Sequence, residues 1–278
     1  MSKIKLLLIN TIGLTGADLL LPKLATYEEI AVLPGQNFSI FNDNLYRVHD
    51  YTGWEVEDIF ESLARNLYTK DGRMWMGLTK NMKAEERKNY SKELHKKTFT
   101  RNFIESSQST QFTSLIKNYI LSYFDACSQN NSKRIYASWF SNNVLLNSSN
   151  YKNFEENVNV IHVSSSISRW LTYISQTRTW DCSKAIKFWL INNLYSLIYS
   201  QDKKNILIIE IDELINDENN LFRKIENFLS LDKTLRNESF QPGFIHMSKK
   251  IVDEQSEIAI QIDKIYQNYP LYKLASRF

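Results

Sequence analysis

The chain has 278 residues, of which 43% are hydrophobic and 23% are charged, and its formal net charge at pH 7 is +3. This is an ordinary globular composition, and the charge is too small to indicate nucleic-acid binding, although it suits an anionic ligand. Cys127 and Cys182 have neither disulfide nor metal-site spacing, and no apolar run is long enough to span a membrane. We therefore expect reduced cysteines and a cytoplasmic protein without a transmembrane segment.

The first element is an apolar run followed by a glycine turn. Lys5–Ile9 has no polar alternation, which is typical of a buried parallel strand, and a helix follows through Leu19–Leu24. The turn between them carries Gly13 and Gly16, and the N–H groups at such a helix start attract anions. No Gly-Lys-Ser/Thr follows, so this is not a triphosphatase P-loop, and a tight connection without a ligand is the alternative interpretation.

The next segments predict a second strand and then a helical insertion. Glu29–Leu33 is the strand, which we expect to end at Pro34-Gly35. Residues 55–127 have helical spacing, with helices expected at 58–67 and 112–120. The Lys/Glu-rich run at 83–97 predicts a solvated helix face.

The second half of the chain returns to alternating strands and helices. Strands are expected at 133–137, 158–163 and 205–211. A long helix lies between the last two, and its expected buried stripe is Ile186, Leu190, Leu194 and Leu197. Asn216 or Asp217 is expected to cap a further helix. That helix carries Leu221, Ile225 and Phe228, and a final helix carries Ile258, Ile262, Ile265 and Tyr269.

This alternation predicts parallel β-α-β units. The expected fold is one α/β domain over residues 1–278, with a P-loop-type parallel sheet of about five strands flanked by helices, and with the insertion at about 55–127. Ligands of such sheets bind at the carboxyl ends of the strands. The turn at 13–18 and the segment at 164–172 are expected to meet there.

Three segments, read in order, resemble the sulfotransferase family. Leu14-Thr15-Gly16-Ala17-Asp18-Leu19-Leu20 stands where the family has Arg/Lys-Ser/x-Gly-Thr/Ser-Thr/Ser-Leu-Leu. Ile161–Thr172 resembles the family's strand followed by Arg-Asp-Pro-x-Asp-Arg-Trp-x-Ser. Ile208–Leu214 and Phe228–Leu231 resemble its Tyr-Glu-Asp-Leu strand end and its Phe-Leu-Gly-Leu helix end.

The resemblance implies transfer of a sulfuryl group from 3′-phosphoadenosine 5′-phosphosulfate to a hydroxyl of a glycan or small molecule, without a metal. It implies that Ser164, Arg169 and Thr172 hold the 3′-phosphate and that Lys249, in a late loop, replaces a missing cation. Ser165, Ser166 and Ser168 add neutral donors. The residues implied for the 5′-phosphosulfate are Gly13, Leu14, Thr15, Gly16, Ala17 and Asp18.

The general base is expected at His49 beside Asp50, since the pKa of a histidine lies near working pH. Family members use a His or Glu soon after the second strand to deprotonate the acceptor hydroxyl. A pair of solvated surface residues is the alternative interpretation of His49 and Asp50.

Three departures from the family pattern favour a second hypothesis. Leu14 and Ser164 replace cations, and losing one Arg–phosphate contact removes roughly 1.5–3 kcal/mol of binding. Asp18 at a helix start accepts hydrogen bonds from the N–H groups that would otherwise bind an anion. The alternative is a non-catalytic protein of the same fold that binds a glycan, a nucleotide or a protein partner. A phosphotransferase is less supported, because the chain has no Gly-Lys-Ser/Thr.

Overall fold

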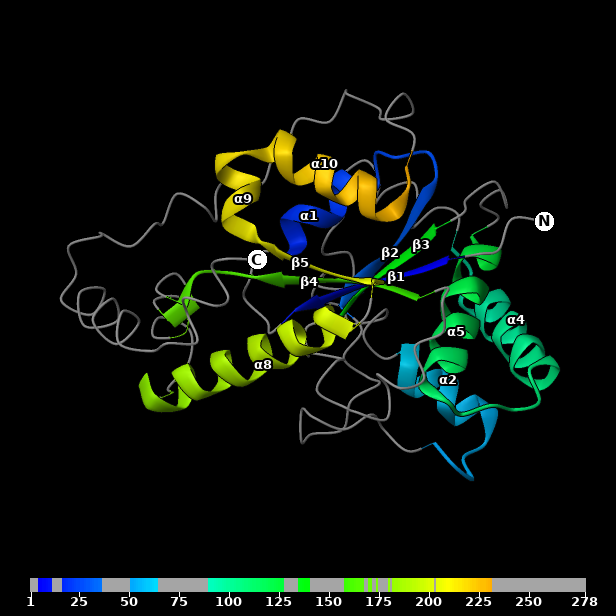
Figure 1. Cartoon of the computed structure of the whole chain (residues 1–278). Helices are drawn as coiled ribbons and strands as arrows, with labels where there is room; N and C mark the ends of the chain where they lie inside the picture. Colours follow the sequence, from blue (N-terminus) through cyan, green and yellow to red (C-terminus); the bar gives the residue numbers. More distant parts are fainter. Residues whose placement is uncertain are drawn as a thin grey trace.

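The computed structural model describes residues 5–11, 17–36, 51–64, 90–127, 135–140, 158–167, 170, 171, 174, 180, 182–202 and 204–231. Its centre is a five-stranded sheet in the order β2-β3-β1-β4-β5, in which every neighbouring pair is parallel (Figure 1). The strands are β1 (Lys5–Thr11), β2 (Ile30–Gln36), β3 (Ile135–Phe140), β4 (Val158–Ser164) and β5 (Ile206–Glu210). The predicted α/β fold with a parallel sheet of about five strands is confirmed.

Helices cover both faces of this sheet (Figure 1). On one face lie α1 (Ala17–Leu24), α9 (Ile211–Asn216) and α10 (Glu218–Leu229). On the other lie α2 (Val56–Ala64), α4 (Lys92–Glu105), α5 (Phe112–Ala126) and α8 (Cys182–Asp202). No helix among the described residues is long and apolar enough to cross a membrane.

Strand β1 is buried on both of its faces, as its unbroken apolar run predicts. Leu7 and Ile9 belong to the core shared with α1 and α10, whereas Leu6 and Leu8 belong to the core shared with α2, α4 and α5. Complete burial of one such side chain stabilises the fold by about 1.5–3 kcal/mol. Because apolar side chains cover both faces of β1, this strand lies in the middle of the sheet.

Several strand ends differ from the prediction, and those of β2 and β5 have a local cause. Strand β2 continues through Pro34 to Gln36 with a register shift after Val32. It is the outer strand among the described ones, and a proline is tolerated at such a position because it removes no hydrogen bond to a second neighbour. Strand β5 ends at Glu210, because Glu210 and Glu213 form a capping box that starts α9 at Ile211. The predicted strand 205–211 is therefore too long at both ends.

Helix α10 follows its sequence signals closely. Of the two predicted caps, Asp217 is the one that the structure uses, and its side chain accepts from the N–H of Asn220 at 3.2 Å. Leu221 and Ile225 are fully buried, and Phe228 is partly buried against the same core. The expected final helix at 258–269 lies outside the described residues.

The insertion helices share one core with the sheet. Phe60 of α2, Phe99 of α4 and Tyr123 of α5 pack in the same cluster as Leu6 and Leu8. The Lys/Glu-rich run is solvated in its described part, since Lys92, Glu93 and Lys97 are exposed, but His95 is fully buried within it. A face with this charge pattern gives no sign of a buried histidine.

The predicted buried stripe of α8 is confirmed only in part, since Ile186 and Leu190 pack against the buried cluster of Trp170 and Trp189. Its members Ile186, Leu190, Leu194 and Leu197 are only partly buried, whereas Ile191 and Ile198 are 47% and 45% exposed. The buried residues of the helix are instead Ala185, Trp189, Asn192 and Ser196. These are mostly small or polar side chains, so the apolar stripe of the sequence does not mark the inward face of this helix.

The positions of Ser196 and Ile198 on α8 lead to a stability prediction. We expect Ser196→Ile to lower the free energy of unfolding by about 1–3 kcal/mol, because a larger side chain overpacks a fully buried position. Ile198→Ser should change it by less than about 0.5 kcal/mol, because Ile198 is half exposed. Urea unfolding of both variants measures this, and the reverse order of effects would contradict the buried position of Ser196 and the exposed position of Ile198.

Candidate functional site at the carboxyl ends of β1 and β4

The path of the chain through the sheet indicates a candidate site at the carboxyl ends of β1 and β4. From β1 the chain proceeds to β2 on one side, and from β4 it proceeds to β5 on the other side. The crevice between two parallel strands whose connections diverge in this way is where open α/β sheets bind ligands. The candidate site is therefore the carboxyl end of the β1–β4 pair.

The register of the two strands brings the carboxyl ends of β1 and β4 together. Thr11 at the end of β1 pairs with Val163, next to the end of β4. Thr11, which precedes the glycine turn in the sequence, and the segment Ser164–Ser166 (the serine segment) consequently lie at the same end of the sheet. That the turn itself meets the segment at 164–172 stays a prediction, because residues 12–16, 168, 169 and 172 lie outside the described residues.

The end of β1 is also held on its other side. The Thr11 hydroxyl donates to the carbonyl of Phe140 at 3.0 Å and accepts from Nε1 of Trp139 at 3.3 Å. Both partners belong to β3, so side-chain bonds supplement the backbone ladder between β1 and β3. The strand end that leads into the glycine turn is thus fixed between two neighbours.

On the α8 side of the sheet, a buried histidine joins three elements. Asn10 of β1 donates through Nδ2 to Nδ1 of His162 in β4 at 2.9 Å, and Nε2 of His162 donates to Oδ1 of Asn193 in α8 at 3.1 Å. Asn193 in turn donates to the carbonyl of Trp189 at 2.9 Å. These roles agree with each other only when the imidazole is neutral and carries its proton on Nε2.

Burial keeps that imidazole neutral. His162 is fully buried, and desolvation lowers its pKa from 6.5 to about 4, although the hydrogen bond to Asn193 acts in the opposite direction. At neutral pH, His162 therefore accepts at Nδ1 and donates at Nε2.

The serine segment is anchored through a carbonyl. The carbonyl of Ser165 accepts from Nε1 of Trp189 at 3.1 Å and from the hydroxyl of Ser164 at 3.3 Å. The hydroxyl of Ser165 is itself buried, and within the described residues it has no hydrogen-bond partner. A buried donor without a partner calls for an explanation, and a ligand oxygen is one.

A helical turn starts at this segment. The N–H of Trp170 donates to the carbonyl of Ser166 at 3.0 Å. Trp170 is buried and stacks on Phe188 of α8, with ring centroids 6.0 Å apart. The chain after β4 is thus packed against the same helix that holds His162.

The described residues test few of the predicted site residues. Ser164 is buried at the end of β4, and Ala17 and Asp18 are the first two residues of α1. The sequence analysis selected none of Asn10, His162 and Asn193, although a polar residue in an apolar strand, as at Asn10 and His162, is a usable signal. The other predicted residues lie outside the described residues; they are Gly13, Leu14, Thr15, Gly16, His49, Asp50, Arg169, Thr172 and Lys249.

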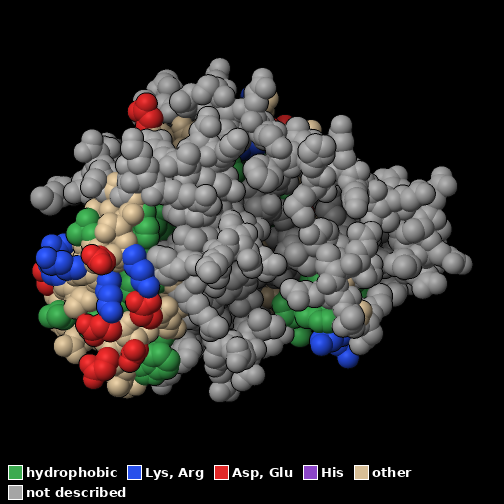
Figure 2. Space-filling view, turned by 180° about the vertical axis from the view of Figure 1, so that it is seen from behind, with side chains coloured by type: hydrophobic (Ala, Val, Ile, Leu, Met, Phe, Trp, Pro, Cys, Tyr) green, Lys and Arg blue, Asp and Glu red, His purple; other side chains and the backbone are tan. Residues whose placement is uncertain are grey.

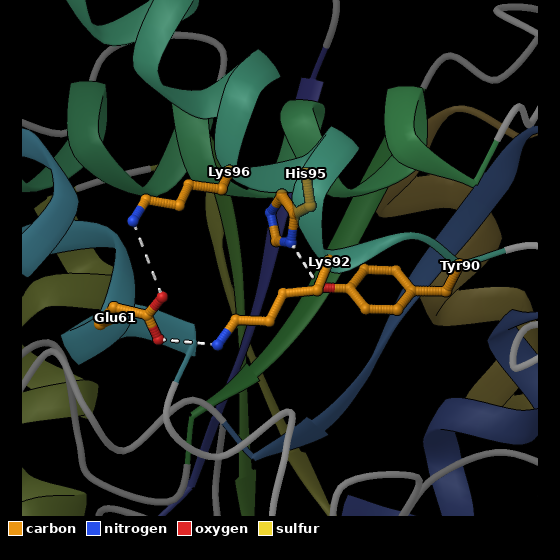
Figure 3. Close-up of polar contacts among 5 residues, drawn as sticks. All are labelled: Glu61, Tyr90, Lys92, His95 and Lys96. Atoms are coloured by element: carbon orange, nitrogen blue, oxygen red, sulfur yellow. Dashed lines mark hydrogen bonds and ion pairs between the residues drawn. The ribbon is translucent and has the colours of Figure 1, made fainter.

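The second buried histidine lies in the insertion, away from this edge. His95 bonds to the Tyr90 hydroxyl through Nδ1 at 3.0 Å (Figure 3). It also bonds to the carbonyl of Tyr119 through Nε2 at 3.2 Å. Nearby, Lys92 and Lys96 point from α4 toward Glu61 of α2, with N–O distances of 2.9 and 4.0 Å. Aromatic rings surround His95, and its burial lowers its pKa to about 3, so it is a neutral core residue.

The surface around the insertion carries mixed charges. Figure 2 shows Lys and Arg side chains interspersed with Asp and Glu side chains in one region of this view. Such a mixture does not attract an anion as a patch of one sign would. Among the described residues there is also no group of three His, Cys, Asp or Glu side chains that could hold a metal ion.

Comparisons with known proteins give structural similarity only. No family model matches the sequence, and no curated protein matches it. The structure is similar to solved sulfotransferases, the family that the three sequence segments resemble.

Three of these structures are as follows. The sulfotransferase domain of the Synechococcus PCC 7002 olefin synthase is 15% identical, with a TM-score of 0.48, over 86% of this chain and 78% of that one. The sulfotransferase domain from the curacin biosynthetic pathway is 10% identical, with a TM-score of 0.44, over 87% and 76%. A sulfotransferase from Alicyclobacillus acidocaldarius is 8% identical, with a TM-score of 0.44, over 90% of each chain.

The two buried histidines predict that acid destabilises the protein. Below pH 6.5 the unfolded chain binds a proton on each, whereas the folded chain does so only near pH 4 for His162 and near pH 3 for His95. Each histidine should therefore lower the free energy of unfolding by about 2 kcal/mol between pH 7 and pH 5.

Urea unfolding of the wild type and of His162→Gln at pH 5, 6 and 7 tests this. The variant should lose about half of the pH dependence, whatever its stability at pH 7, since only His95 then contributes. An unchanged slope would show that His162 is not neutral and buried in the folded protein.

Proposed function

We propose that the chain is a sulfotransferase that moves a sulfuryl group from 3′-phosphoadenosine 5′-phosphosulfate to a hydroxyl of a glycan or small molecule. The observation that carries the proposal is the pairing of Thr11 with Val163. It supports the proposal because the strands that precede the glycine turn and the serine segment, the two segments that resemble the phosphate-binding motifs of that family, end side by side.

The residues at this edge fit a phosphate-bearing ligand. The buried hydroxyl of Ser165 is a donor without a partner among the described residues, and the start of α1 adds N–H groups with a favourable dipole. Neutral donors in a buried site interact strongly with an anion, because water does not screen them. In the proposed reaction the bond between the sulfuryl group and the 5′-phosphate of the nucleotide breaks. The sulfuryl group passes to the acceptor oxygen, and adenosine 3′,5′-bisphosphate leaves.

The residues of the chain would then act by position and charge. Backbone N–H groups of the turn stabilise the negative charge that develops during an in-line displacement. Thr15, Arg169 and Lys249 would contact the phosphates, and His49, with Asp50 beside it, would accept the proton of the acceptor hydroxyl. No metal takes part in the proposed transfer.

A non-catalytic binding protein is the second candidate, and Ser164 favours it. A buried serine bonded to a carbonyl stands where the resembled motif has an arginine. The described side chains at this edge, which are Asn10, Thr11, Ser164 and Ser165, carry no positive charge. Such a site binds an anion more weakly and stabilises a transferring group less.

Titration with adenosine 3′,5′-bisphosphate in a thermal-shift assay tests the proposal. Ligand at 100 times its Kd should add about 2.7 kcal/mol to the free energy of unfolding, without magnesium. Thr15→Ala and Arg169→Ala should reduce the shift. A kinase would instead be stabilised by ATP with magnesium, and no shift at millimolar bisphosphate would leave only the non-catalytic candidate.

Ser165→Ala gives a sharper prediction. Its hydroxyl has no partner among the described residues, so its removal should leave the melting temperature of the ligand-free protein unchanged or higher. The same change should weaken bisphosphate binding about tenfold to a hundredfold, because a hydrogen bond to a charged group contributes roughly 1.5–3 kcal/mol. Isothermal titration calorimetry measures the affinity, with Ser114→Ala in α5 as the matched control. Equal affinities for the two variants would remove Ser165 from the site.

A further inference from the structure

The face of β1 and β4 that meets α8 changes character at its carboxyl end. Alternate residues share one face of a strand, and the first two register pairs on this face are apolar. These pairs are Leu6 with Val158 and Leu8 with Val160, and all four side chains belong to one hydrophobic cluster. The third pair is Asn10 with His162, and both members are fully buried.

A buried polar pair is costly where an apolar pair would fill the space. The cost is offset only when every donor and acceptor is satisfied, and here both ring nitrogens of His162 have partners. The core does not require these groups, because the two pairs before them close the same face with hydrocarbon. Their presence at the edge that carries the candidate site indicates a role in that site.

The bonds from this pair lead to the serine segment. His162 bonds to Asn193, Asn193 bonds to the carbonyl of Trp189, and the Trp189 indole bonds to the carbonyl of Ser165. Helix α8 therefore contacts β4 at His162 and the chain three residues later. The other ring nitrogen of His162 bonds to β1 one residue before its end.

From this geometry we propose that His162 and Asn193 are positioning residues for ligand binding. They hold α8, the end of β1 and the serine segment in one arrangement. The carbonyl of Ser165 is thereby fixed, and its hydroxyl is left to donate to an oxygen of a bound anion. The inference rests on the proposed function, since it concerns the same phosphate-binding edge.

Helix α8 offers a matched control for a test of this role. Asn192 and Asn193 are adjacent, and each donates through Nδ2 to the carbonyl four residues earlier, at 2.7 and 2.9 Å. The bond to His162 is made by Asn193. Substituting each residue separately distinguishes the bond to His162 from the bond within the helix.

The experiment measures the Kd of adenosine 3′,5′-bisphosphate by calorimetry, and the melting temperature of each ligand-free protein. Asn193→Leu and Asn193→Ala should raise the Kd about tenfold, as expected when a donor to a charged ligand is misplaced. Asn192→Leu should change the Kd by less than about threefold, even where it lowers the melting temperature more.

The outcomes separate the two proposals. If the wild type does not bind the bisphosphate, the proposed function fails and this inference fails with it. If the wild type binds and the Asn193 variants bind equally well, only the positioning role is overturned. A loss of affinity that follows the melting temperature across all variants, Asn192→Leu included, would also overturn it, because that is the behaviour of a merely structural residue.

Discussion

The burial of β1 on both faces is the constraint on which the architecture depends. A strand without a solvated side needs helices above and below it and neighbours along both edges. Leu7 and Ile9 require α1 and α10, whereas Leu6 and Leu8 require the insertion helices. In the observed strand order, with β1 in the middle, the connections from β1 and β4 diverge, which is the arrangement at which open α/β sheets bind ligands.

Helix α8 shows how the buried polar pair Asn10 and His162 affects its surroundings. Its inward face carries Trp189, Asn192 and Ser196, and the neighbouring Asn193 reaches His162. Small and polar side chains allow the helix to approach the strands and to satisfy their buried groups. The exposed Ile191 and Ile198 follow from this, because the helix is turned toward its polar contacts.

The sequence predicted what local patterns determine. Apolar runs located the strands, and the capping signal at Asp217 located the start of α10. Prediction from the sequence failed where a structural feature depends on a residue far away in the chain. The inward face of α8 depends on His162, 31 residues earlier in the chain, and the site depends on a pairing between Asn10 and His162, which are 152 residues apart. Neither separation leaves a periodic signal in the sequence.

The course of β2 through Pro34 has a consequence for the behaviour of the protein in concentrated solution. Among the described strands, β2 is an edge of the sheet, and a strand edge is a template on which another chain can add a strand. Proline has no N–H to offer such a chain, and the register shift after Val32 interrupts the regular spacing of the remaining donors. The opposite edge, β5, has only five residues and ends at an exposed glutamate. Both margins of the sheet therefore resist intermolecular β-pairing, which protects the folded protein from ordered aggregation.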